Sequence, residues 1–172
     1  MLQSIDELSR EQALQLLEDF AKRWLAHDGL WFQSIERERG LDEAIHHDTE
    51  AWRRFTVIEA KRIMEFLALP VQGGLDALES ALKFRLYAFL NKQRISRPDP
   101  NTLVFLMTDC RVQSARERKQ MQYFPCKSVG EVEYSLFASM IDSRIKTRCL
   151  SCPPERTTNE YHCGWEFTLP QK

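Results

Sequence analysis

The spacing of apolar residues predicts a helix near the start of the chain. Over residues 9–26 apolar side chains recur every three or four positions, behind a capping box formed by Ser9 and Gln12. Gly29 follows as a C-terminal cap, so the helix is expected to end before it. Its buried stripe is expected to consist of Ala13, Leu16, Leu17, Phe20 and Trp24.

Helical spacing continues through the first half of the chain. A short amphipathic segment at 30–38 closes at Gly40, and a long helix is predicted over 41–69. Pro70 stops that helix, because proline has no backbone N–H to donate. A third helical stretch is predicted over 75–91. The apolar stripe of the long helix is Trp52, Phe55, Ile58, Ile63 and Phe66.

The spacing of apolar residues changes after residues 97–101. These residues are a cluster of turn formers and mark the clearest internal boundary. Residues 102–108 form a short apolar run of strand formers, and two later segments alternate apolar with polar side chains. The predicted elements are strands at 102–108, 144–149 and 161–169, a helix at 128–141, and a helix or loop at 112–122.

These elements predict an α+β fold. We expect an N-terminal helical layer packed on a small antiparallel sheet formed by the C-terminal half. At this length one domain, residues 1–172, is expected, with a helical part over about 1–95 and a cysteine-bearing part over about 101–172.

Composition narrows the functional classes. With 43% hydrophobic and 28% charged residues the chain is globular, and a net charge of −1 argues against a general nucleic-acid binder. No apolar run is long enough to span a bilayer, and the first residues do not read as a secretory signal. We therefore expect a cytoplasmic protein with no membrane association, and a homodimer is compatible with the sequence.

The five cysteines carry the main candidate chemistry. Cys149 and Cys152 form a CxxC pair, Cys163 returns on the next strand, and Cys126 precedes a helix. This spacing predicts that the four thiols lie within reach of one ion, zinc or another transition metal, with Cys126 and Cys163 no more than about 8 Å from the pair. Two alternatives stay open, namely reduced thiols without a metal and a disulfide.

Cys110 lies at the end of the central strand, beside Asp109 and Arg111. Asp109 is a candidate base and Cys110 a candidate reactive thiol, because strand ends often carry reactive groups. Arg111, Lys127 and Arg148 each adjoin a cysteine, so a small anionic ligand such as a carboxylate is predicted to bind them. The alternative is a buried structural thiol with solvated charges around it.

Seven stretches of the chain carry a family resemblance. They are Leu30–Phe32, Ile58–Arg62, Leu82–Tyr87, Asp109–Gln113, Phe124–Ser128 and Cys149–Pro154, with Cys163–Phe167 after the last. On these residues the chain resembles an uncharacterised family of prokaryotic cytosolic proteins that looks related to L-2-amino-thiazoline-4-carboxylate hydrolases. It is more distantly similar to the small-molecule-binding domain named for the vinyl reductases of chlorophyll synthesis. The resemblance implies a ligand pocket and hydrolysis.

Two functions follow as expectations. The first is a small-molecule-binding protein that hydrolyses a small carboxylate compound with a metal-bound water at a cysteine-rich site. The second is a non-enzymatic sensor or scaffold whose cysteines hold a structural metal. Four protein ligands would favour the structural metal, and an open coordination position would favour the enzyme.

Overall fold

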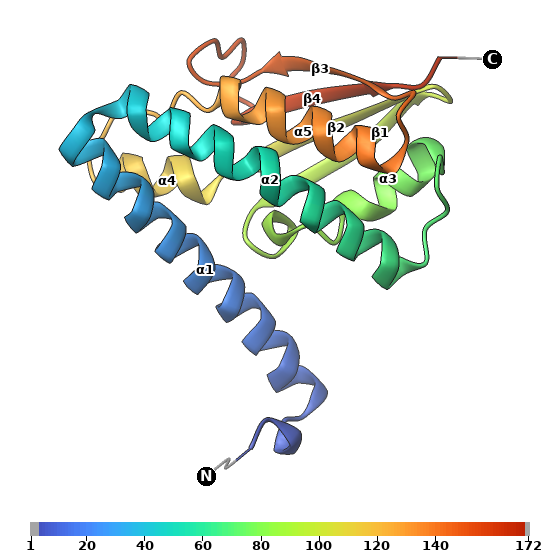
Figure 1. Ribbon diagram of the computed structural model, residues 1–172, viewed down its shortest axis with the longest axis horizontal. Helices are drawn as coiled ribbons and strands as arrows, with labels where there is room; N and C mark the ends of the chain where they lie inside the picture. The colour runs from blue at the N-terminus through green and yellow to red at the C-terminus, as the bar shows by residue number, and fades with distance from the viewer. Residues whose placement is uncertain (1–3, 171–172) are drawn as a thin grey trace.

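A computed structural model describes residues 4–170. Two long antiparallel helices begin the fold after a short 3₁₀ helix, η1 (Ile5–Glu7). They are α1 (Arg10–Arg39) and α2 (Leu41–Leu67), joined at Gly40, whose φ of 93° is accessible to glycine at little cost. Figure 1 shows the N-terminal part of α1 leaving the body of the molecule.

The expected break at Gly29 is wrong, because α1 runs through it as one helix. The predicted capping box at Ser9 and Gln12 is present. Beyond the predicted stop, the ring of Phe32 packs against that of Phe124, with centroids 4.9 Å apart, and Glu36 pairs with Arg116 at 2.9 Å. These contacts keep the second half of α1 helical where glycine alone would favour an end.

The third predicted helix is divided into two pieces. α3 (Gly74–Leu82) is followed by a 3₁₀ helix, η2 (Leu86–Phe89). Arg85 between them has extended backbone, and its side chain pairs with Glu59 of α2. The backbone N–H of Leu86 donates to the same carboxylate at 3.1 Å. A buried ion pair therefore interrupts the helix that the apolar spacing predicts.

The C-terminal half supplies a four-stranded antiparallel sheet of order β1-β2-β4-β3, which confirms the α+β prediction. Its strands are β1 (Lys92–Asp99), β2 (Thr102–Asp109), β3 (Lys146–Ser151) and β4 (Cys163–Thr168). β1 was not predicted, because it is a polar edge strand with few apolar residues to reveal it. The other three overlap the predicted strands.

Two further helices complete the fold, α4 (Arg111–Arg118) and α5 (Lys127–Ile141). Figure 1 shows α5 lying between α2 and the strands, so that helices cover one face of the sheet. The core forms in this layer, where Phe137 of α5 and Leu78 of α3 join Phe105 and Phe167 of the sheet.

The predicted apolar stripes are only partly buried. Leu17 and Phe20 of α1, and Ile58 and Phe66 of α2, are each more than half exposed. Trp52 and Ile63, in contrast, are buried as expected. Among the helices of residues 4–170, none combines the length and apolar composition that crossing a membrane requires.

Candidate functional site

The sheet places two of the predicted ligand cysteines on its helix-facing side. Trp165 of β4 is paired with Phe105 of β2 on one side and with Cys149 of β3 on the other. Cys163 lies two residues before Trp165 on the same strand, so its side chain is on the same face. It pairs with Met107 of β2.

The other two thiols come from loops that meet this face. Cys126 is the residue at the N-terminus of α5, and its Sγ lies 3.5 Å from Sγ of Cys152. Gln113 of α4 holds the loop before Cys126, exchanging two hydrogen bonds with the backbone of Phe124, at 2.8 and 3.0 Å. The backbone N–H of Lys127 donates to the Pro153 carbonyl at 3.0 Å, which ties α5 to the CxxC loop.

Cys152 is the centre of the thiol group. Hydrogen bonds with Cys126, Cys149 and Cys163 raise its pKa above the ordinary value. The contact with Cys152 lowers the pKa of Cys149, and the charge of Lys127 lowers it further. Cys126, Cys149 and Cys163 therefore all lie beside Cys152.

The convergence does not by itself make a metal centre. All five cysteines are free thiols. Within residues 4–170, no group of three or more histidine, cysteine, aspartate or glutamate side chains could hold a metal ion as the side chains are placed. The predicted zinc site stays a prediction, and so does the alternative of reduced thiols without a metal.

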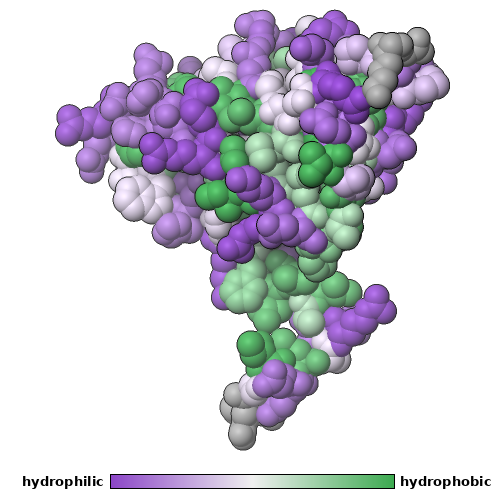
Figure 2. Space-filling view, turned by 45° about the vertical axis from the view of Figure 1, so that its right-hand side comes forward, coloured by the Kyte–Doolittle hydropathy of each residue, from purple (hydrophilic) through white to green (hydrophobic). Residues whose placement is uncertain are grey.

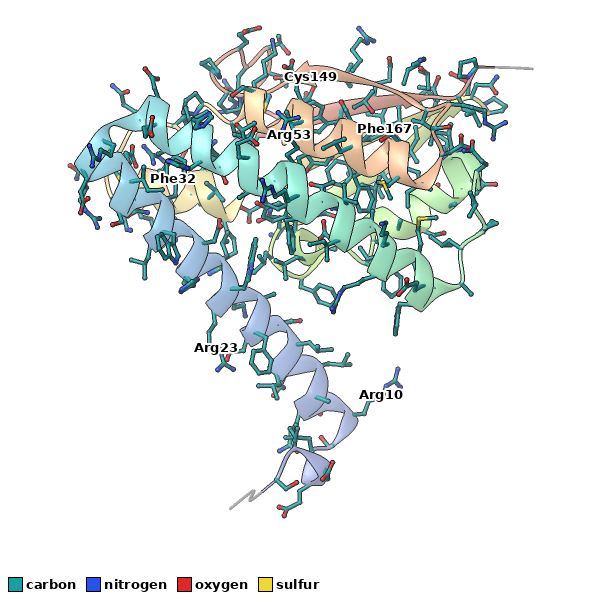
Figure 3. All side chains as sticks on the ribbon, viewed as in Figure 1. Arg10, Arg23, Phe32, Arg53, Cys149 and Phe167 are labelled. Carbon is teal, nitrogen blue, oxygen red and sulfur yellow. The ribbon has the colours of Figure 1, made fainter. Side chains whose placement is uncertain are left out.

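A cavity of about 420 Å³ adjoins the thiol group. α1 forms one wall with Phe32, which Figure 3 labels, and the sheet forms the opposite wall with Trp165. Other aromatic side chains that line the cavity are Trp52, Tyr87, Phe124 and Tyr134. Tyr134 stacks on Trp165 with centroids 4.7 Å apart, and Tyr87 stacks on Trp52 at 5.5 Å. A volume of this size is typical of small-molecule sites.

Three carboxyl groups also line the cavity, Asp28, Asp48 and Glu133. Burial raises the pKa of Asp48 to about 7, with the charges of Asp28 and Glu133 adding to the effect. Burial likewise raises the pKa of Glu133 to about 7, against the attraction of Arg85. Both carboxyls therefore exchange protons near neutral pH, in a wall whose surface is largely apolar.

Arg85 supports this wall from behind. It is buried and lies 2.7 Å from both Glu59 and Glu133. Its contact with Glu133 is an ion pair by distance, although the Nη1 and Oε1 atoms are not aligned as a hydrogen bond. The guanidinium also lies over the ring of Phe137, 4.5 Å from its centroid. Arg85 thus fixes the position of Glu133 at the cavity.

The remaining predicted site residues are divided between the cavity and the surface. Cys110 and Arg111 line the cavity, and burial raises the pKa of Cys110 to about 12. The carboxylate of Asp109 accepts a hydrogen bond from Ser114 at 3.4 Å and does not line it. Lys127 pairs with Glu155 at 2.6 Å and Arg148 with Glu166 at 2.9 Å, both outside the lining. The structure therefore brings Cys110 and Arg111 together with the cavity but leaves the other three outside.

The comparisons with known proteins give a family without an assigned role. A family of unknown function, DUF6125, matches residues 6–169. The chain belongs to this family. No curated protein matches the sequence. The match to the family covers both the helical half and the thiol-bearing half of the chain. The resemblance to L-2-amino-thiazoline-4-carboxylate hydrolases stays a prediction.

Sequence reasoning missed the acidic and aromatic part of the site. Asp28, Asp48 and Glu133 come from three helices, and only the fold brings them to one cavity. One signal was available for Glu133, because it lies one turn along α5 from Gly130 on a face that the helical period turns toward the core. A charged residue on a predicted buried face is a candidate functional residue.

Proposed function

We propose that this protein is a small-molecule-binding domain whose ligand occupies the aromatic cavity, and that the four thiols hold a zinc ion that fixes one wall. The observation that carries the proposal is the cavity itself, of about 420 Å³, with Cys126, Cys152 and Cys163 in its lining. A concave, largely apolar space with a few polar groups is the usual form of a ligand site.

An unpaired donor in the wall supports a ligand. Trp165 is 1% exposed, and its Nε1 has no hydrogen-bond partner among the described residues. A buried N–H without an acceptor costs about 1–3 kcal/mol, which a bound acceptor would recover. Asp48 and Glu133 add two carboxyls that donate or accept according to their protonation.

The charge distribution favours a ligand with an aromatic or apolar body and an anionic group at the rim. Exposed Lys22, Arg111, Arg118 and Lys119 all belong to the lining. An acidic group placed among them would avoid the buried carboxyls and keep part of its hydration. A ligand of this kind agrees with the carboxylate compound predicted from the sequence. Of the three basic residues predicted to bind it, only Arg111 lines the cavity.

Binding of matched probes tests the ligand class. Benzoate, benzamide and benzylamine share one ring and differ in charge, so their effects on the melting temperature compare anionic, neutral and cationic groups. We expect benzoate to bind best, and Arg111→Gln to weaken it about tenfold, as for loss of one charged hydrogen bond. Arg148→Gln is the matched control, because Arg148 pairs with Glu166 outside the cavity. The proposal would be contradicted if no probe bound, or if Arg111→Gln and Arg148→Gln weakened benzoate binding equally.

The zinc proposal is supported by the contacts that converge on Cys152. Sulfurs around one tetrahedral zinc lie about 3.8 Å apart, given ligand bonds of about 2.3 Å, and the Cys126–Cys152 separation is 3.5 Å. Zinc bound by four protein ligands is structural, with no open position for water. The ion would anchor the start of α5 to the CxxC loop.

Elemental analysis of protein purified without chelators tests this part. We expect about one zinc per chain, lost in Cys152→Ser and kept in Cys110→Ser, because Cys110 lies outside the four-thiol group. Metal-free protein whose five thiols all react with a thiol reagent would reject the zinc site and leave the cavity proposal standing.

Hydrolysis is the second candidate function, and one observation favours it. Two carboxyls with a pKa of about 7 in one cavity are suited to general acid–base catalysis at neutral pH. The raised pKa of Cys110 argues against a thiolate nucleophile. Incubation with L-2-amino-thiazoline-4-carboxylate tests this candidate, and turnover that Asp48→Asn abolishes would support it.

A further inference from the structure

The N-terminal part of α1 presents an apolar stripe that its own chain does not cover. We call residues 5–20 the arm. Leu14, Leu17 and Phe20 recur at a spacing of three along it and are 51%, 52% and 54% exposed. Figure 2 shows hydrophobic surface gathered along this part, below the body of the molecule. A helix in water normally turns such a stripe toward a partner.

A second uncovered apolar surface lies on α2. We call it the α2 face, made of Ile58 and Phe66 of α2 and of Phe84 from the segment between α3 and η2, which are 53%, 77% and 43% exposed. The rings of Phe66 and Phe84 are 6.0 Å apart, so they form one patch. Phe66 lies eleven residues, or about three turns, after Phe55, and therefore points in nearly the same direction.

The two surfaces are the separated halves of one helix pair. Opposite positions in an antiparallel pair joined at Gly40 lie at equal distances from it along the chain. Trp24 and Phe55, at 16 and 15 residues from Gly40, are in contact. Leu14 and Phe66 are each 26 residues from Gly40, yet both are exposed, because α1 diverges from α2 beyond Trp24 (Figure 1).

We propose that two copies of this chain pair by exchanging arms, each arm covering the α2 face of the other copy. Each chain carries both surfaces, so a two-fold pair satisfies both at once with one self-complementary contact. Covering these six side chains would remove about 600 Å² of apolar surface from each copy, most of the roughly 800 Å² per partner that a standard stable interface buries. The continuous helix of α1 keeps its own arm away from its own α2 face.

Sedimentation of the full chain at micromolar concentration is the first test. We expect a dimer. Leu17→Glu on the arm and Phe66→Glu on the α2 face should each raise its dissociation constant at least about a hundredfold, because each places a charge in a buried apolar contact. Glu18→Gln, an exposed change on the same arm, should leave it within about twofold. Circular dichroism should show that all variants are folded.

A cross-link then identifies the exchanged contact without using the native cysteines. With p-benzoylphenylalanine in place of Phe20, illumination should give a band at twice the chain mass, with the link mapping to the α2 face. A monomeric wild-type chain, dissociation unaffected by either variant, or links formed only within one chain would overturn the proposal. Binding of a monomeric chain to anionic vesicles through the arm would also overturn it.

Discussion

At the scale of single residues, the close contact between Gly130 and Trp165 decides how tightly α5 packs at the cavity wall. Gly130 of α5 lies against Trp165, and a Cβ at this position would be only 2.6 Å from Cζ2 of the indole. The Trp165 ring is buried among Tyr134 and its neighbours and has little room to move. The absence of a side chain at position 130 is therefore what allows helix α5 to pack this tightly on the sheet.

We predict that Gly130→Ala lowers the free energy of unfolding by about 1–2 kcal/mol, because overpacking outweighs the gain in helix propensity. Urea denaturation with tryptophan fluorescence measures both the stability and the displacement of Trp165. Gly29→Ala is the control, since its Cβ would meet only Nε2 of Gln33, at 4.0 Å. That change should leave stability equal or higher. If both variants lost the same unfolding free energy, the contact with Trp165 would not be the cause of the destabilisation.

The buried carboxyls give a second prediction at this scale. Asp48 holds its proton up to about pH 7 when folded but releases it near its ordinary pKa of 3.8 when unfolded. The folded state therefore binds more protons between these values, so Asp48 stabilises the fold at low pH and this contribution is lost as pH rises toward 7. The raised pKa values of Glu133, about 7, and of Asp28 act in the same direction, and the lowered pKa of His162 opposes them below 6.5.

We predict that Asp48→Asn makes the fall in unfolding free energy between about pH 4 and pH 7 shallower, leaving the part that Glu133 contributes. Urea titrations at several pH values measure it. Asp19→Asn, an exposed carboxylate paired with Arg23 on α1, should leave the wild-type slope in place. A slope in Asp48→Asn identical to that of the wild type would show that Asp48 is not the source.

At the scale of elements, Asp142 joins the end of α5 to the start of α3. Its buried carboxylate accepts the backbone N–H of Gly74 at 3.0 Å and the guanidinium of Arg144 at 2.6 and 2.9 Å. The bonds from Arg144 lower the pKa of Asp142 to about 2. Because Gly74 begins α3 with a φ of 70°, this bond also fixes an unusual helix start.

We predict that Asp142→Asn lowers the free energy of unfolding by about 1–3 kcal/mol at pH 7, because one acceptor oxygen is lost in a buried site. The difference from wild type should shrink as pH falls from about 4 toward 2, where the wild-type carboxylate takes up its proton. Asp76→Asn is the control. Its fully exposed side chain pairs with Arg97 on the surface, and its loss should change stability by less than about 0.5 kcal/mol. Similar losses in both variants would contradict the prediction.

At the scale of the whole molecule, the two halves share one core. Ala60 and Leu78 from the helical half belong to the same buried cluster as Phe105, Phe137 and Trp165 from the second half. The connection between the halves is the strand β1 rather than a flexible linker. Neither half can leave without exposing apolar side chains of the other.

We predict one cooperative unfolding transition. Far-ultraviolet circular dichroism, which reports mainly on the helices, and tryptophan fluorescence, which includes Trp165 in the sheet, should give coincident curves in urea. Coincidence is expected because the shared core is lost in one step. A stable folded fragment ending near residue 100 after limited proteolysis would contradict this.

The predictable part of the fold follows from local pattern. The 3.6-residue spacing of apolar side chains identified most of α1, α2 and α5, and the apolar run at 102–108 identified β2. The failures occur where tertiary contacts overrule that pattern. The ion pair of Arg85 with Glu59 interrupts a predicted helix. The contacts of Phe32 with Phe124 and of Glu36 with Arg116 keep α1 helical beyond Gly29.

The convergence of the thiols was also determined by the sequence itself. Cys149 lies in β3 and Cys152 follows directly after that strand, with an irregularity in the register between Cys149 and Ser151. Antiparallel pairing of β4 with β3 returns Cys163 to the same sheet. These are short-range constraints, which spacing along the chain records directly. The sequence likewise determined the amphipathic stripe of the arm, since helical period alone reveals it.

Only the tertiary structure decided what surrounds the thiols and what covers the stripe. Asp28, Asp48 and Glu133 meet at one cavity because α1, α2 and α5 pack together, and no spacing records a meeting between separate helices. The same packing left Leu17 and Phe66 exposed, although the pattern predicted both to be buried. The spacing of apolar residues shows that one face of a helix will be buried against another surface. The direction in which each helix runs determines where that surface lies.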